Sequence, residues 1–167
     1  LDFVETYDVE DTGIASSNGA IVFLGEHERR RHSAVGQRYT LAIPEAAELA
    51  VDPTEIFGAI TDAASYLDVG QCQEDILLVA APSARAEWGP LGTQTGDDGI
   101  WALDRCPLAR PNTTWIHEYV HTRQAPRCEP SMRWFAEGTA CYYATLCSIR
   151  RGDIDFDTGR RFLGRTS

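Results

Sequence analysis

The stretch WIHEYVH at residues 115–121 sets the strongest limit on how this chain can fold. His117 and His121 are four residues apart, so on a helix they project from one face, about one turn from each other. Two imidazoles in that arrangement can reach the same metal ion. Glu118 follows the first histidine and is rotated off that line, where it can lean over the metal's open side as a general base. The pattern therefore predicts a helix here and requires a third ligand from elsewhere.

A candidate for the third ligand is Glu137, in the stretch RWFAEGTA. A catalytic zinc ion takes three protein ligands and leaves its fourth position to water. Glu137 lies 16 residues after His121 on a separate predicted helix, and the loop QAPRCEPS is long enough to fold that helix back antiparallel to the first. The alternative is a helix that carries two histidines and a glutamate on its surface. The Glu137 stretch favours the metal site over that alternative.

The part of the chain before these helices has the patterns of a β-sheet. Strands are predicted at 19–26 and 37–44 from their β-branched and aromatic content, with the charged tract HERRRH as the hairpin tip between them. A continuous apolar run at 75–82 predicts a buried central strand. A polar, glycine-rich loop follows it and leads to a short run at 100–103, IWAL, which is predicted to be an edge strand. The fold class predicted is α+β, with a mixed sheet followed by helices.

Helices are predicted at 51–70, 111–124 and 130–152. Asp52 is the expected cap of the first helix and Gly70 its expected end. Ser131 is the expected cap of the third helix, and Gly152 is expected to close it. After it, DFDTGRRFLGR has the look of the opening of another helix.

The motifs HEYVH and WFAEG together resemble the gluzincins, zinc metallopeptidases with an HExxH helix and a glutamate ligand from the next helix. In particular the chain is similar to the aminopeptidase-N-like and peptidase MA-like branch, where W-x-x-E-G-x-A is typical. The resemblance implies one catalytic zinc ion with ligands His117, His121 and Glu137, and Glu118 as the general base. It also implies a zincin-like fold in which an edge strand of the sheet aligns the substrate. The specific motif covers residues 117–144 of the chain.

The reaction implied is zinc-dependent hydrolysis of a peptide bond in a peptide or protein substrate. Glu118 would take a proton from a metal-activated water and pass it to the leaving amine. The choice between endopeptidase and aminopeptidase stays open, because TGDDGIW, with Asp97 and Asp98, has no clear match to the stretch with which aminopeptidases of this branch recognise a free amine.

Two features depart from the family pattern. Many relatives carry a carboxylate four residues after the glutamate ligand, where it supports a ligand histidine, but this chain has Cys141 there. Losing such a partner typically costs about 10- to 100-fold in metal affinity or activity. The residue that stabilises the oxyanion in this branch is a Tyr or His well downstream of the glutamate. Tyr142 and Tyr143 follow Glu137 closely, but helical packing is the favoured interpretation of both, as core packing is for Trp115 and Trp134.

These departures motivate two alternatives. The first is a zinc-binding but catalytically weak scaffold or sensor domain of a larger surface or membrane protein. The second is a structural metal site, for which Cys141, one helical turn from Glu137, is the available soft ligand. A further pair, His27 and His32, is interpreted as solvated side chains rather than a metal site, because no third ligand is near them in the sequence.

Length and charge bound the remaining possibilities. The chain has 167 residues, so we expect one catalytic domain, sheet-rich over 1–110 and helical over 111–167, from a longer protein. It carries 15 basic residues besides histidine, all Arg, and 25 acidic residues, for a net charge of −10, which argues against a nucleic-acid partner. No apolar run approaches the roughly 20 residues that cross a bilayer. The oligomeric state and the compartment stay open, with an extracytoplasmic or membrane-tethered location among the alternatives.

The cysteines leave the redox compartment undecided. There are five of them, an odd number, so at least one cannot pair within the chain. Cys106 and Cys128 flank the WIHEYVH stretch in proline-containing loops. One interpretation is a disulfide between them, in an oxidising compartment. The other is that each is a small buried hydrophobic side chain.

Overall fold

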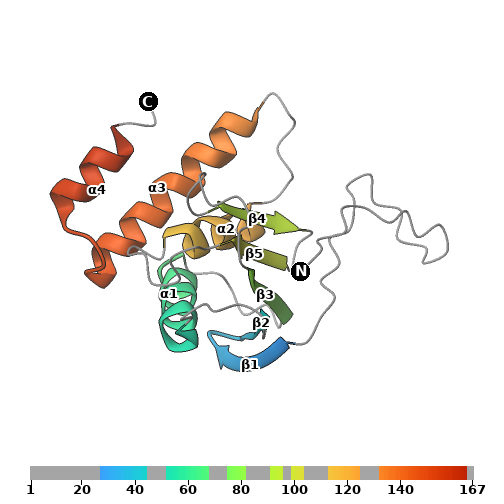
Figure 1. Cartoon of the computed structure of the whole chain (residues 1–167). Helices are drawn as coiled ribbons and strands as arrows, with labels where there is room; N and C mark the ends of the chain where they lie inside the picture. The colour runs from blue at the N-terminus through green and yellow to red at the C-terminus, as the bar shows by residue number, and fades with distance from the viewer. Residues whose placement is uncertain are drawn as a thin grey trace.

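The computed structural model describes residues 27–44, 52–67, 75–81, 91–95, 99–103, 113–124 and 132–164. The elements in chain order are β1 (His27–Ala34), β2 (Gln37–Pro44), α1 (Pro53–Tyr66), β3 (Asp75–Ala81), β4 (Leu91–Thr95), β5 (Gly99–Leu103), α2 (Thr113–Arg123), α3 (Arg133–Arg151) and α4 (Phe156–Leu163). The predicted α+β class, a sheet-forming part followed by helices, is confirmed (Figure 1).

The strands form one five-stranded mixed sheet in the order β1-β2-β3-β5-β4. β2, β3 and β5 run parallel to one another, while β1 and β4 pair antiparallel at the two edges. The connection from β2 to β3 passes through α1, as parallel neighbours require a crossover. The apolar run at 75–82 was predicted as the central strand, and β3 does lie in the middle of the sheet.

The first hairpin differs from the prediction. The tract HERRRH is not a hairpin tip but most of β1, which pairs with β2 from His27 opposite Pro44 to Ala34 opposite Gln37. The turn is at Val35 and Gly36, both with positive φ, at 53° and 75°. Two consecutive residues with positive φ are typical of the tight turn that matches strand twist. A charged strand is stable here because β1 is an edge strand, exposed along most of its length. The other predicted strand, 19–26, lies outside the described residues.

The edge strand at the opposite side also differs from the prediction. The IWAL run belongs to β5, which is flanked by β3 and β4 and is therefore not an edge. The true edge is β4, whose sequence LGTQT lies in the stretch predicted as loop. The composition of LGTQT, polar with one glycine, does not favour a strand. β4 forms because its backbone pairs antiparallel with β5.

The core lies between one face of the sheet and the helices. On β2 and β3, the residues in alternate positions Tyr39, Leu41, Ile76 and Leu78 are at most 1% exposed and belong to a cluster with apolar side chains from α1, α2 and α3. Fully burying a side chain such as Leu or Ile contributes about 1.5–3 kcal/mol. Leu77, on the opposite face of β3, is 45% exposed. Burial thus alternates from Asp75 to Leu78, whereas the next two residues of β3, Val79 and Ala80, are both buried.

The helix ends agree only partly with the expected caps. Asp52 caps α1 as predicted, its carboxylate accepting a hydrogen bond from the backbone N–H of Thr54. α1 ends at Tyr66, before Gly70, because the backbone already turns at Leu67. The N-cap position of α3 is Met132 rather than Ser131, and it makes no side-chain capping hydrogen bond. Gly152 closes α3 as predicted, in the left-handed conformation with φ of 78°.

The last helices complete the packing. α4 confirms the helix predicted in DFDTGRRFLGR, and it is capped by Asp155. Arg151, near the end of α3, pairs with Asp62 of α1 and with Asp153, so it links α1 to α3. No helix in the described ranges is long and apolar enough to cross a bilayer.

Candidate metal centre

α2 turns one side into the core and another toward α3. Trp115, Ile116 and Tyr119 are at most 3% exposed, so the packing role predicted for Trp115 is confirmed. The hydroxyl of Tyr119 donates a hydrogen bond of 2.9 Å to Oε1 of Gln37 on β2, a buried polar contact that fixes the helix on the sheet. His117 and His121 lie on the other side of α2 and are partly buried.

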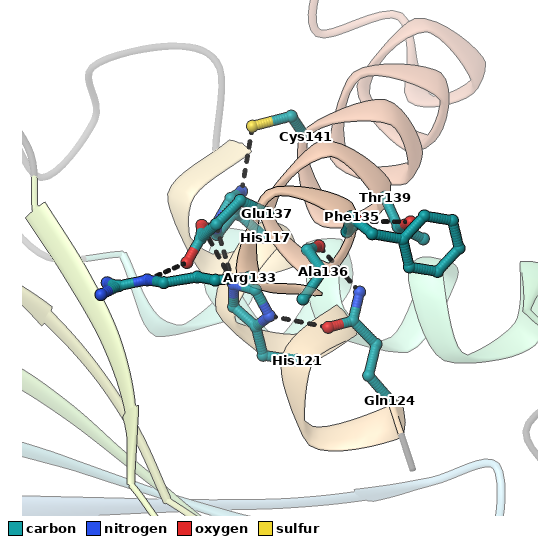
Figure 2. A network of polar contacts seen from close by, with 9 residues as sticks. All are labelled: His117, His121, Gln124, Arg133, Phe135, Ala136, Glu137, Thr139 and Cys141. Carbon is teal, nitrogen blue, oxygen red and sulfur yellow. Dashed lines mark hydrogen bonds and ion pairs between the residues drawn. The ribbon is translucent and has the colours of Figure 1, made fainter. Parts of the chain in front are cut away.

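α3 runs back along α2 in the opposite direction, as predicted. The end of α2 lies next to the start of α3. There the side chain of Gln124, the residue after α2, donates a hydrogen bond to the backbone carbonyl of Ala136. One turn of α3 further on, Cys141 contacts His117, which lies earlier on α2. This antiparallel pairing brings Glu137 opposite both histidines (Figure 2).

The structure brings His117, His121 and Glu137 into one cluster. Oε2 of Glu137 lies 3.2 Å from Nε2 of His117 and 3.5 Å from Nε2 of His121. The two Nε2 atoms are 3.0 Å apart, and the rings stand nearly perpendicular, at 80°. Among the described residues this is the group of histidine, cysteine and acidic side chains that could hold a metal ion.

The spacing of these atoms suits zinc. Ligand atoms about 2.0–2.2 Å from a tetrahedral zinc ion lie about 3.3–3.6 Å from one another. The observed separations of 3.0, 3.2 and 3.5 Å are within a few tenths of an ångström of that range. Two imidazole nitrogens and one carboxylate oxygen also form a known donor set of catalytic zinc sites, with a position left for water. The side chains therefore fit the ion without rearrangement of either helix.

Contacts around the cluster involve two residues that the sequence analysis did not single out. Oε1 of Gln124 lies 2.9 Å from Nδ1 of His121. Nε of Arg133 lies 3.7 Å from Oε1 of Glu137, on the side of the carboxylate away from the histidines (Figure 2). Helical spacing could have found both, because Gln124 follows His121 by three residues and Arg133 precedes Glu137 by four.

Cys141 does not join the ligand set. Its Sγ lies 3.6 Å from Nδ1 of His117, whereas the nitrogen of that ring in the cluster is Nε2. Burial and the nearby charge of Glu137 raise the pKa of the Cys141 thiol, so it stays protonated at neutral pH. The structural-metal alternative with Cys141 as a ligand has no support in this arrangement.

Burial controls the protonation of the other groups. Burial lowers the pKa of His117, and the neighbouring His121 adds to this effect, against the opposing charge of Glu137. A neutral imidazole is the form that binds a metal. Glu118 is 5% exposed, and burial, followed by the charge of Glu137, raises the pKa of its carboxyl from 4.5 to about 7. A carboxyl with that pKa can accept and release a proton near neutral pH.

The remaining candidates lie away from the cluster. Tyr143 packs against the core, as predicted, whereas Tyr142 is 47% exposed. The core-packing prediction for Trp134 is wrong, because this side chain is 72% exposed at the start of α3. His32 is exposed, as predicted for a solvated side chain, but it lies on β1 rather than in a hairpin tip, and its ring stacks against Phe57. Asp97, Asp98, Cys106 and Cys128 lie outside the described residues.

Comparison with known proteins gives a structural likeness only. No protein-family model and no curated protein match the sequence. Among solved structures, the chain is similar to a crystal structure of an aminopeptidase N family protein from Idiomarina loihiensis, with a TM-score of 0.56 and 17% sequence identity. The similarity covers 81% of this chain and 27% of that protein, so the chain spans about a quarter of its length. The likeness shows that the chain has the fold of a region of an aminopeptidase N family protein. In this chain the cluster of His117, His121 and Glu137 lies between α2 and α3.

Proposed function

We propose that this chain is a zinc-dependent peptidase that holds the ion with His117, His121 and Glu137 and uses Glu118 as its general base. The observation that carries the proposal is the cluster itself, three donor atoms within 4.8 Å of one another. The carboxyl of Glu118 is buried and lies near enough to Glu137 for that charge to raise its pKa. The likeness to the fold of an aminopeptidase N family protein adds support, because it extends over 81% of the chain.

The chemistry divides between the ion and the protein. A bound zinc ion supplies Lewis acidity, which acidifies a water molecule and polarises a carbonyl. Glu118 would accept the proton of that water and return it to the leaving amine. Glu137 and the histidines keep the ion in place, and Arg133, beside Glu137, holds the carboxylate from its outer side.

The sheet offers a place for the substrate. β4 is an edge strand that packs against α2, and within the described part of the chain it pairs only with β5. Its other edge has backbone groups that an extended peptide can pair with, as in other cases of strand addition. We infer that the substrate is an extended peptide held along β4, with its scissile bond at the cluster.

The test combines metal content with peptide hydrolysis. The purified chain is expected to contain one zinc ion, measured by elemental mass spectrometry, and Glu137→Ala is expected to lose it. Glu118→Gln is expected to keep the ion and lose hydrolysis of a peptide library, because the variant retains the ligands but not the base. Glu28→Gln on β1, far from the cluster in the sheet order, is the matched control and should behave as the wild type. Hydrolysis by Glu118→Gln at the wild-type rate, or a chain that binds no zinc, would refute the proposal.

One observation favours the weaker alternative, a zinc-binding scaffold or sensor. A thiol 3.6 Å from Nδ1 of His117 is a poorer hydrogen-bond acceptor than the carboxylate of many relatives. In that case zinc is bound, no peptide in the library is cleaved, and Glu118→Gln leaves the function of the parent protein unchanged. Metal content and hydrolysis measured on one preparation separate the two proposals.

A further inference from the structure

We propose that Gln124 and Cys141 are positioning residues for the rings of the two histidines, His121 and His117 respectively. Gln124 fixes the tautomer of its histidine, whereas Cys141 does not. This inference rests on the proposed metal site and deepens it. Each residue contacts the Nδ1 atom of a histidine whose Nε2 atom faces Glu137 (Figure 2). A metal ion takes the lone pair of Nε2, so the proton of each neutral ring must be on Nδ1.

At His121 the hydrogen-bond directions are determined by a backbone carbonyl. The carbonyl of Ala136 can only accept, so the side-chain group of Gln124 that lies 3.0 Å from it is the amide nitrogen. The amide oxygen of Gln124 is then the atom 2.9 Å from Nδ1 of His121, and it too can only accept. His121 must therefore carry its proton on Nδ1. The contacts of Gln124 permit the metal-binding tautomer of His121 and exclude the other.

At His117 the partner does not make that choice. The thiol of Cys141, 3.6 Å from Nδ1, is a weak donor as well as a weak acceptor. It can accept from Nδ1–H, which leaves Nε2 free for a metal, or donate to Nδ1, which leaves the proton on Nε2. Oε2 of Glu137, 3.2 Å from that Nε2, accepts a hydrogen bond in the second arrangement. Cys141 thus tolerates both tautomers, and His117 is the less prepared ligand.

The two contacts predict responses of different size when each is removed, and a gain when the weaker one is improved. Gln124→Met keeps the length of the side chain but removes its acceptor, and zinc affinity is expected to fall by about 10- to 100-fold. Cys141→Ala removes only a weak partner, and the expected loss is smaller, at most about 10-fold. Cys141→Asp replaces the thiol by a group that only accepts, and zinc affinity is expected to rise above that of the wild type.

A second Gln124 variant separates ring positioning from helix packing. Gln124→Glu keeps an oxygen for Nδ1 of His121 but cannot donate to the carbonyl of Ala136. If Gln124 acts by positioning, this variant recovers zinc affinity relative to Gln124→Met even where its melting temperature stays low. If Gln124 only joins α2 to α3, both variants lose affinity and stability together.

The measurement is the zinc Kd of the whole chain, by competition with a chromophoric chelator, with folding checked by circular dichroism. Cys147→Ala is the matched control, because Cys147 lies on the same helix but is buried in the core, and its removal should lower the melting temperature without changing the Kd. Imidazole ¹⁵N spectra provide a second readout, in which His121 is expected to be protonated on Nδ1 in the wild type and to lose that preference in Gln124→Met.

The outcomes are distinguishable from those of the proposed function. Wild-type zinc affinity in Gln124→Met and in both Cys141 variants would overturn the positioning role while leaving the metal site intact. Loss of affinity in Gln124→Glu equal to that in Gln124→Met would also overturn it. A wild-type chain that binds no zinc would refute the proposed function, and the positioning role with it.

Discussion

At the scale of single residues, neighbours in one short stretch have different surroundings. His117 and His121 are partly buried and face Glu137, while Glu118, between them in the sequence, is 5% exposed. Burial of a carboxyl disfavours its charged form, and a nearby negative charge such as that of Glu137 adds to this effect. The raised pKa of Glu118 is therefore a cost to the fold at neutral pH and, in the proposed function, the property that suits it to proton transfer.

This cost predicts a pH dependence of stability. The pKa of Glu118 is about 7 in the folded chain against an ordinary 4.5, so the folded state keeps a proton that the unfolded state has already released. The contribution of Glu118 to stability is therefore complete below about pH 4.5 and is lost as the pH rises through about 7. In urea unfolding with a chelator present, wild type should lose stability over this range relative to Glu118→Gln. Parallel curves for the two proteins would contradict the prediction.

At the scale of elements, the β1–β2 turn contains a residue that its backbone conformation disfavours. Val35 has a φ of 53°, in the left-handed region, where a side chain branched at Cβ is crowded. Gly36, the next residue, adopts its φ of 75° without such a cost. The register of the hairpin follows from this turn, which is why the charged tract becomes a strand.

The strain at Val35 predicts a stabilising substitution. Val35→Asn should raise the free energy of unfolding by about 1 kcal/mol, because asparagine tolerates the left-handed region far better than valine. Gly36→Ala at the neighbouring position should lower it. Chemical denaturation of the three proteins measures both effects, and a destabilised Val35→Asn would mean that packing of the valine outweighs its backbone strain.

A glycine inside α3 and the glycine that caps its C-terminal end predict effects of opposite sign. Gly152→Ala should destabilise the chain by about 1 kcal/mol, since its φ of 78° places any Cβ in an unfavourable position. Gly138 is inside the helix, and a Cβ there meets nothing within 4 Å. Gly138→Ala should therefore stabilise the chain by about 0.5–1 kcal/mol, the difference in helix propensity. Thermal unfolding measures both effects. If Gly152→Ala raised the melting temperature as Gly138→Ala is expected to do, the end of the helix would differ from the one described.

At the scale of the whole molecule, the cluster exists because two helices are held in a fixed relation. α2 is held on the sheet by buried apolar contacts and by the Tyr119–Gln37 hydrogen bond, and α3 packs against both α1 and α2. Arg151 adds a polar link between α3 and α1. A ligand that binds both histidines and Glu137 therefore stabilises the packing of the two helices as well as the site.

Linkage makes this a measurable effect. Zinc at about 100 times its Kd should raise the stability of the folded chain by about 2.7 kcal/mol, and a chelator should reverse the shift. Glu137→Ala should lose most of the response, whereas Glu118→Gln should keep it, because Glu118 is not a proposed ligand. An equal melting-temperature shift in Glu137→Ala would indicate that zinc binds elsewhere on the chain.

The sequence by itself determined much of this protein. Helical spacing placed His117 and His121 on one face, because residues four apart on any helix lie side by side. The stretch RWFAEGTA identified Glu137 as the candidate for the third ligand. Local patterns also predicted β3, from its continuous apolar run, and the two helix ends at Asp52 and Gly152, from the capping preferences of aspartate and glycine. Local conformational preferences depend on residues only a few positions apart, so they can be predicted from the sequence.

The tertiary structure decided what depends on residues far apart in the chain. Backbone pairing turned the charged tract into β1 and a polar loop into β4, although their compositions favour other conformations. Burial raised the pKa of Glu118, and the approach of α3 placed Glu137 and Cys141 against His117. Burial, strand pairing and the meeting of two helices are sums over many distant contacts, so no short stretch of sequence contains them.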